Sequence, residues 1–281
     1  MRKIALVISL VAVLFGACGK NDNPSVNDSL PAPTGIAVTT KDFQFADFPA
    51  TVQVDNLAKL TLTNQGTQDH EAAILKLTDG KTVDDVKAFL GSKTPSGPPP
   101  FAVAGGLTAV APGATSSVTQ TLPAGSYAFI CYVAGADGVP HFAKGMLSPF
   151  AVTGNSTSSL PLPDGVNATG TEFHFDLPAL KAGTTTIRFT NRGTQDHVLG
   201  LARVADGKTA ADALKWLTDH QGPPPLVFMG GPAAAAGGSN SFQAKLAKGT
   251  YVFYCPVPDT GPGGDGKPHF THGMFQGVTI A

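Results

Sequence analysis

Apolar and polar residues alternate along several short segments of the chain. Leu60 and Leu62 alternate with threonines, and Ile187 and Phe189 alternate with polar residues in the second half. Because successive side chains of a β-strand point to opposite faces, this pattern predicts half-buried strands. Two later segments, residues 127–131 and 251–255, are apolar at nearly every position, which predicts strands buried on both faces.

One helix is predicted in each half. Residues 82–85 (Thr-Val-Asp-Asp) and 209–212 (Thr-Ala-Ala-Asp) have the form of a capping box, in which the Thr side chain caps the first turn of a helix. Apolar residues then recur on one helical face in both halves. Many short strands with one inserted helix predict an all-β sandwich of the Greek-key type.

The same order of motifs occurs twice. Residues 63–70 (TNQGTQDH) recur as residues 190–197 (TNRGTQDH). Other pairs of matching segments follow in the same order: 79–82 and 206–209, 97–100 and 222–225, 125–131 and 249–255, 140–146 and 268–274. A unit of over a hundred residues is too long for a solenoid repeat, so it indicates a duplicated domain. We expect domains over residues 35–153 and 165–281, with a linker over 154–164.

The N-terminus has the pattern of a secretory signal. A basic start precedes an apolar run over residues 4–15, which is too short to span a bilayer, and Gly-Ala-Cys18 follows. This segment resembles the lipobox of bacterial lipoproteins, which implies a signal peptide over residues 1–18 and lipidation of Cys18; an ordinary signal peptide is the alternative. Residues 19–34 are polar and Pro-rich and are expected to form a flexible tether. We therefore predict an exported lipoprotein of the periplasm or cell surface, held to the membrane by its lipid alone.

Charge and cysteine content narrow the function. The 19 Lys and Arg residues nearly balance the 20 Asp and Glu residues and form no dense cluster, which argues against nucleic-acid binding. Besides Cys18, the chain contains Cys131 and Cys255. Export exposes these two thiols to oxidising conditions, so a disulfide between them has to be considered.

Each half also carries His, Cys, His and Met in the same order. The residues are His70, Cys131, His141 and Met146, then His197, Cys255, His269 and Met274. The first His follows an Asn-x-Gly turn, and four residues separate the second His from the Met in both halves. In these residues the chain resembles the cupredoxin family of plastocyanin and azurin, and its last loop is similar to the type 1 domain of copper nitrite reductase. The resemblance implies two tandem cupredoxin-like Greek-key β-sandwiches, each with one short inserted helix and up to one type 1 copper ion.

These residue types suit copper. Two imidazoles and a thiolate form a trigonal blue-copper site, with a thioether as a long axial ligand. The sulfur ligands stabilise Cu(I), and imidazole suits both oxidation states. In this interpretation Cys131 and Cys255 are metal-bound thiolates in separate pockets, which argues against a disulfide between them.

The loop between the Cys and the second His departs from the family pattern. Nine residues intervene in the first copy and thirteen in the second, whereas plastocyanin and azurin have only a few. The insert of the second copy, residues 259–266, is Gly-rich and is expected to be flexible. Doubling a loop adds only about 0.6 kcal/mol of closure free energy, so its length does not exclude a site.

An enzyme of the multicopper type would need further copper ligands. In nitrite reductase a His directly precedes the type 1 Cys, and multicopper oxidases have His on both sides of it. Here the preceding residues are Ile130 and Tyr254. Only His174, His220 and His272 remain after the eight assigned ligands, and they are too scattered for a catalytic cluster. We therefore expect no enzymatic activity.

Three functions remain open. The first is electron transfer in the cell envelope through Cu(I) and Cu(II), with redox partner proteins that the sequence does not identify. The second is envelope copper storage or trafficking, which would use the same ligands. The third is a metal-free cupredoxin-like structural or binding module.

Overall fold

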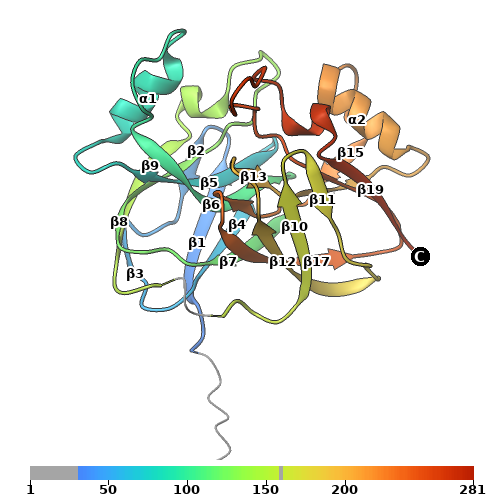
Figure 1. Cartoon of the computed structure of the whole chain (residues 1–281), viewed down its shortest axis with the longest axis horizontal. Coiled ribbons are helices and arrows are strands. Elements are labelled where there is room, and N and C mark those ends of the chain that lie inside the picture. Colours follow the sequence, from blue (N-terminus) through green and yellow to red (C-terminus); the bar gives the residue numbers. More distant parts are fainter. Residues whose placement is uncertain (1–30, 158–160) are drawn as a thin grey trace, which may run out of the picture. The chain divides into compact units, whose positions relative to one another are not determined.

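The structure is a computed structural model that describes residues 31–157 and 161–281 (Figure 1). The predicted signal peptide, Cys18 and most of the predicted tether lie outside the described residues. From Ala32 to Ala281 the chain forms one compact unit. The described part consists mainly of β-strands with two α-helices, which confirms the predicted all-β class. None of its helices is long and apolar enough to cross a membrane.

The first repeat forms two sheets. One contains β7, β4, β1 and β2, and the other contains β3, β9, β8, β5 and β6, each in spatial order. The elements are β1 (Thr34–Lys41), β2 (Gln44–Ala46), β3 (Thr51–Gln53), β4 (Ala58–Asn64), β5 (His70–Leu77), α1 (Val83–Gly91), β6 (Phe101–Val110), β7 (Thr115–Gln120), β8 (Gly125–Ile130), the 3-10 turn η1 (His141–Lys144) and β9 (Leu147–Thr153). Pairing is antiparallel except for β1 with β4 and β3 with β9.

The second repeat follows the same plan. Strands β11, β10, β12 and β17 lie in one sheet, and β15, β14, β18 and β19 in the other, with a short β13–β16 pair. The elements are β10 (Val166–Thr171), β11 (His174–Asp176), β12 (Gly183–Asn191), β13 (His197–Val198), β14 (Gly200–Val204), α2 (Ala210–Asp219), β15 (Leu226–Phe228), β16 (Ala233–Ala234), β17 (Ser239–Leu246), β18 (Gly249–Tyr254), the 3-10 turn η2 (His269–His272) and β19 (Phe275–Ile280).

The apolar pattern explains the layers. Leu60 and Leu62 of β4 are buried, while the threonines beside them are partly exposed. In β8, Tyr127 and Phe129 join the core between the two sheets, whereas Ala128 and Ile130 of the same strand pack in a separate cluster with Val86 of α1. The strand is apolar on both faces because one face lies inside the sandwich and the other lies under a helix. Burying each large side chain contributes about 1.5–3 kcal/mol.

Both predicted helices are present and begin where the capping boxes predict. Thr82 accepts a hydrogen bond from the backbone N–H of Asp85, and the Asp85 carboxylate accepts from the backbone N–H of Thr82. Thr209 and Asp212 repeat this arrangement before α2. The inner faces carry buried Val86 in α1 and buried Ala213 and Leu217 in α2.

Backbone pairing joins the two repeats in both layers. Strand β17 pairs with β7, so the first sheets of the two repeats form one eight-stranded sheet. In the other layer, the N–H of Thr108 in β6 donates to the Gly231 carbonyl (3.0 Å), and the N–H of Gly230 donates to the Ala109 carbonyl (2.8 Å). This pairing between the repeats was not predicted from the sequence, from which we expected two domains separated by a linker.

Candidate metal centres

The first predicted ligand set converges inside the first repeat. The Nδ1 atoms of His70 and His141 are 3.1 Å apart, and the Cys131 Sγ lies 4.0 Å and 3.6 Å from them. All three residues are fully buried. A circle through three atoms with these separations has a radius of about 2.1 Å, which is close to the bond lengths of a metal ion to imidazole nitrogen and thiolate sulfur.

The second ligand set reproduces this geometry. The Nδ1 atoms of His197 and His269 are 3.1 Å apart, and the Cys255 Sγ lies 3.9 Å and 3.5 Å from them. These residues are also fully buried. The corresponding circle has a radius of about 2.0 Å, again close to metal–ligand bond lengths. Both cysteines are free thiols, in separate ligand groups.

The two methionines close the ligand loop by their backbones. The N–H of Cys131 donates to the Met146 carbonyl (3.1 Å), and the N–H of Met146 donates to the His141 carbonyl (3.0 Å). Cys255, Met274 and His269 repeat these bonds at 3.1 Å and 3.0 Å. Met146 and Met274 are fully buried in the same apolar clusters as their cysteines.

The different lengths of the two loops do not change the arrangement of the predicted ligands. Each loop is closed by an isolated bridge, Ala134 with Pro140 in the first repeat and Pro258 with Pro268 in the second. The extra residues of the second loop lie beyond its bridge. Because the closing hydrogen bonds on the inner side are the same, both loops present the second His in the same place.

The Asn-x-Gly turn has a physical role in placing the first His. The side-chain oxygen of Asn64 accepts a hydrogen bond from the N–H of Gly66 (2.9 Å). The side-chain nitrogen of Asn64 donates to the backbone carbonyls of Gln68 and Val110 (both 2.8 Å). A Cβ atom at Gly66 would lie only 2.7 Å from the His70 Nε2. Glycine is therefore required here by close approach rather than by its backbone angles.

An acidic residue and a Phe between β1 and β2 complete the first centre. The His70 Nε2 lies 3.0 Å from Asp42 Oδ1, and the ring of Phe43 packs edge-on against His141 at 5.2 Å. Gln68 Oε1 lies 3.3 Å from the Nε2 of His141. Sequence reasoning missed these roles, although the matching segments Asp-Phe-Gln-Phe (42–45) and Glu-Phe-His-Phe (172–175) are a further repeat that could have indicated them.

Burial controls the protonation of the donor atoms. Loss of hydration lowers the pKa of the four histidines predicted as ligands, to about 4 for His141 and His197. Neutral imidazole leaves a nitrogen lone pair free for a metal. Burial also raises the pKa of Cys131, and it raises that of Cys255 to about 12. Both are therefore neutral thiols at pH 7 until a bound cation displaces the proton.

A third group of metal-ligand side chains lies at the edge of the second loop. Asp259, Asp265 and His272 come together there. Their oxygens already accept from protein donors, since Gln195 Nε2 donates to Asp259 (3.0 Å) and Lys267 Nζ and His272 Nε2 bind Asp265 (2.9 and 3.0 Å). These contacts tie down the insert that was expected to be flexible.

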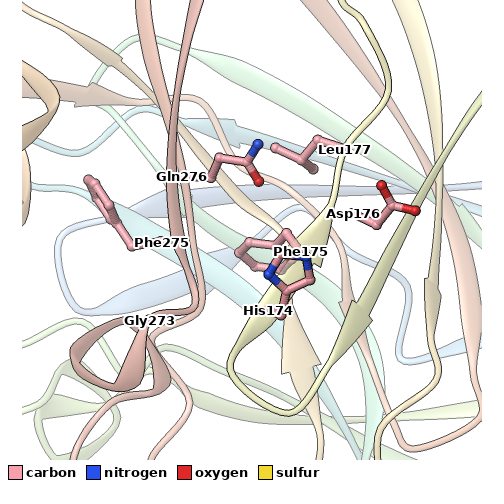
Figure 2. A pocket seen from close by; sticks show the side chains of 7 residues that line it. All are labelled: His174, Phe175, Asp176, Leu177, Gly273, Phe275 and Gln276. Carbon is pink, nitrogen blue, oxygen red and sulfur yellow. The ribbon is translucent and has the colours of Figure 1, made fainter.

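A pocket at the surface of the second repeat is lined by seven residues, none of which is a predicted copper ligand (Figure 2). Its lining residues belong to β11 and β19 or directly follow β11 and η2: His174, Phe175, Asp176, Leu177, Gly273, Phe275 and Gln276. His174 and His220 are both exposed and distant in sequence from the ligand loops. Neither belongs to the groups of metal-ligand side chains found in the described part of the chain.

The donor set fits copper. Each centre offers two neutral imidazole nitrogens and one cysteine sulfur around a single point, with a buried Met on the same loop. This combination of soft sulfur and imidazole is typical of a blue-copper centre. The structure thus brings together the His, Cys and His of each predicted set and places the Met in the adjoining core.

No family model matches the sequence, and the comparison with curated proteins gives no match. Solved structures with a similar backbone include an auracyanin from Roseiflexus castenholzii (21% identity, 43% of this chain, 98% of that one, TM-score 0.28). Auracyanin A of Chloroflexus aurantiacus, a "blue" copper protein, is similar at 20% identity over 43% of this chain and 100% of its own, with a TM-score of 0.31. A copper nitrite reductase from Nitrosomonas europaea covers 89% of this chain and 94% of its own at 13% identity, with a TM-score of 0.23. Similarity at this level leaves the function to be argued from the ligand groups themselves.

Proposed function

We propose that the protein is a type 1 copper protein of the cell envelope that carries electrons, with one copper ion in each repeat. The observation that carries this proposal is the pair of buried groups in which two Nδ1 atoms and one Sγ atom surround a point at bonding distance from all three. When bound, copper would supply one-electron exchange between Cu(I) and Cu(II).

The chain's own residues would have defined roles. His70, His141 and Cys131 would bind the first ion, with Met146 as a weak axial ligand, and His197, His269, Cys255 and Met274 would bind the second. In each loop, the backbone hydrogen bonds from Cys to Met and from Met to His would hold the donors in one arrangement. A rigid donor set suits electron transfer, because the ligands need to move little when the ion changes oxidation state.

Burial favours electron transfer over catalysis. The His and Cys donors of both centres are fully buried, whereas a catalytic metal keeps a coordination position open to water or substrate. Ile130 and Tyr254 stand where a nitrite reductase has the His that leads to a second copper. We therefore infer that the chain has no catalytic copper.

The envelope location rests on the N-terminal sequence. We propose that the apolar run before Cys18 directs export and that lipid on Cys18 anchors the protein, with residues 19–34 as tether. Two duplicated domains, residues 35–153 and 165–281, would then be presented together to redox partner proteins.

Copper titration of the Cys18→Ser variant, which keeps only the two centre thiols, tests the proposal. We expect an intense thiolate-to-copper band in the visible spectrum that saturates at two equivalents of Cu(II) and bleaches reversibly with a reductant. The Cys131→Ser and Cys255→Ser variants should each lose about half of the band. Bound copper that does not cycle would favour storage or trafficking. A folded protein that binds no copper would refute the proposal and favour a metal-free module.

A further inference from the structure

The two candidate centres differ outside their ligands, beginning with the first His. In the first repeat, His70 Nε2 lies within hydrogen-bond distance of Asp42 Oδ1, at 3.0 Å. In the second repeat, the corresponding distance from His197 Nε2 to Glu172 Oε1 is 4.0 Å, and this Nε2 has no hydrogen-bond partner among the described residues. A carboxylate is present at both positions, but only Asp42 bonds to its histidine.

The turn after the Asn explains the difference. Asp42 Oδ1 accepts from the N–H of Thr67 (2.9 Å) while also facing His70, and its Oδ2 accepts from the Thr67 hydroxyl (2.6 Å). Glu172 instead directs one oxygen, Oε1, to both the N–H and the hydroxyl of Thr194. The longer side chain is therefore occupied by the turn and stops short of the imidazole.

The second His also has an outer hydrogen-bond partner in the first repeat only. Gln68 Oε1 lies 3.3 Å from the His141 Nε2. Its counterpart Gln195 is held by the second-repeat insert, since its Nε2 donates to Asp259 and its Oε1 accepts from the N–H of Thr260 (2.9 Å). His269 Nε2 is buried without a hydrogen-bond partner among the described residues.

These outer contacts act on the donor strength of the imidazole. An acceptor that binds the Nε2–H makes the opposite Nδ1 a stronger base, and a carboxylate does so most strongly. A stronger donor favours the more highly charged Cu(II) over Cu(I). The hydrogen bond to the Cys sulfur acts in the same direction. The backbone nitrogen of Val198 lies 3.3 Å from the Cys255 Sγ, whereas that of Glu71 lies 3.5 Å from the Cys131 Sγ. A closer donor weakens the sulfur as a copper donor, which favours Cu(I) in the second centre. Hydrogen bonds to this sulfur also tune the potential of blue-copper centres.

We propose that the two centres are not equivalent, and that Asp42 and Gln68 give the first centre the lower reduction potential. An electron shared between the two ions would then reside mainly on the second, with one copper oxidised and the other reduced and no proton exchanged. Asp42 and Gln68 act through the ligands as positioning residues. This inference rests on the proposed copper-binding function.

Proteins with a single centre test it directly. The Cys255→Ser variant keeps only the first centre and Cys131→Ser keeps only the second, and each potential is measured by following the visible band during redox titration. We expect the lower potential in the protein that keeps the first centre. This comparison needs no change at Asp42.

The two acidic positions provide matched variants. Asp42→Asn in the first-centre protein should shift the Cu(II)/Cu(I) equilibrium about tenfold toward Cu(I), which is a rise of about 59 mV for one electron. Glu172→Gln in the second-centre protein should change the ratio less than twofold. Equal potentials, a reversed order or equal responses of the two variants would overturn the proposal while leaving copper binding intact. Absence of the band from the single-centre proteins and from the Cys18→Ser protein would overturn the proposed function as well.

Discussion

The close approach at Gly66 makes a stringent test of how the first centre is built. A Cβ atom at this position would lie 2.4 Å from Asp42 Oδ1 and 2.7 Å from the His70 Nε2. Normal contacts require about 3.5 Å, so Gly66→Ala forces both side chains to move, each by about 1 Å. These movements are expected to break the hydrogen bond that joins Asp42 to His70.

The magnitude follows from three contributions. Crowding a packed site costs about 1–3 kcal/mol, and a hydrogen bond to a charged group contributes about 1.5–3 kcal/mol, less here because Asp42 is partly exposed. Replacing Gly by Ala also restricts the unfolded chain, which returns about 0.4–1 kcal/mol. We therefore expect Gly66→Ala to lower the free energy of unfolding of the metal-free protein by about 2–4 kcal/mol, and to weaken copper binding about 10–100-fold.

Urea unfolding of the metal-free protein, followed by copper titration, measures both effects. Gly35→Ala is the matched control, because Gly35 lies in β1 with open space where its Cβ would be and needs no positive φ. It should unfold at the same urea concentration as the parent or slightly higher. If Gly66→Ala behaves like Gly35→Ala in both assays, then His70 is not held by close packing and our account of the Asn-x-Gly turn is incorrect.

Two further predictions concern the rest of the fold. Thr82→Ala should destabilise the protein by about 1 kcal/mol in urea unfolding, because it removes the N-cap of α1; Thr78→Ala, outside the capping box, is the comparison, and equal losses would contradict the cap's role. The buried neutral histidines His141 and His197 should also cost the metal-free protein stability as pH falls from about 6.5 toward 4, since their folded pKa values are near 4 and the unfolded chain takes up their protons first; Glu71 and Asp69, whose pKa values burial raises to about 7 and about 6, act in the opposite direction. Thermal unfolding of the parent and of a His141→Gln variant across this range isolates the histidine contribution, and identical pH profiles for the two proteins would show that His141 is not buried in the neutral form.

The convergence of His, Cys and His in each repeat could be predicted from sequence because most of each group follows local order along the chain. Cys131, His141 and Met146 lie on one loop, so their spacing limits how they can be arranged. The early His required the repeat, which showed that the Asn-x-Gly turn and His70 recur together as Asn191 to His197. The capping boxes were also readable, because a cap involves only four consecutive residues.

What the sequence did not predict depends on contacts between distant segments. Asp42 reaches His70 across the turn between β1 and β2, and Gln195 is taken up by an insert more than sixty residues later. Whether Glu172 makes the bond that Asp42 makes depends on distances of about 1 Å, which residue type alone does not determine. The joint between repeats involves backbone groups, whose pairing leaves little trace in side-chain pattern.

The β7–β17 joint also bears on how the two copies became one molecule. Val118 pairs with Leu60 in one repeat and Phe242 pairs with Ile187 in the other, so Val118 and Phe242 are equivalent positions, and across the joint they face each other. A contact in which equivalent residues meet is the signature of an isologous, twofold-symmetric dimer. The chain is therefore arranged like a symmetric homodimer whose subunits have been fused. Once fused, either half can change, as Asp42 and Glu172 have, while its partner remains permanently in place.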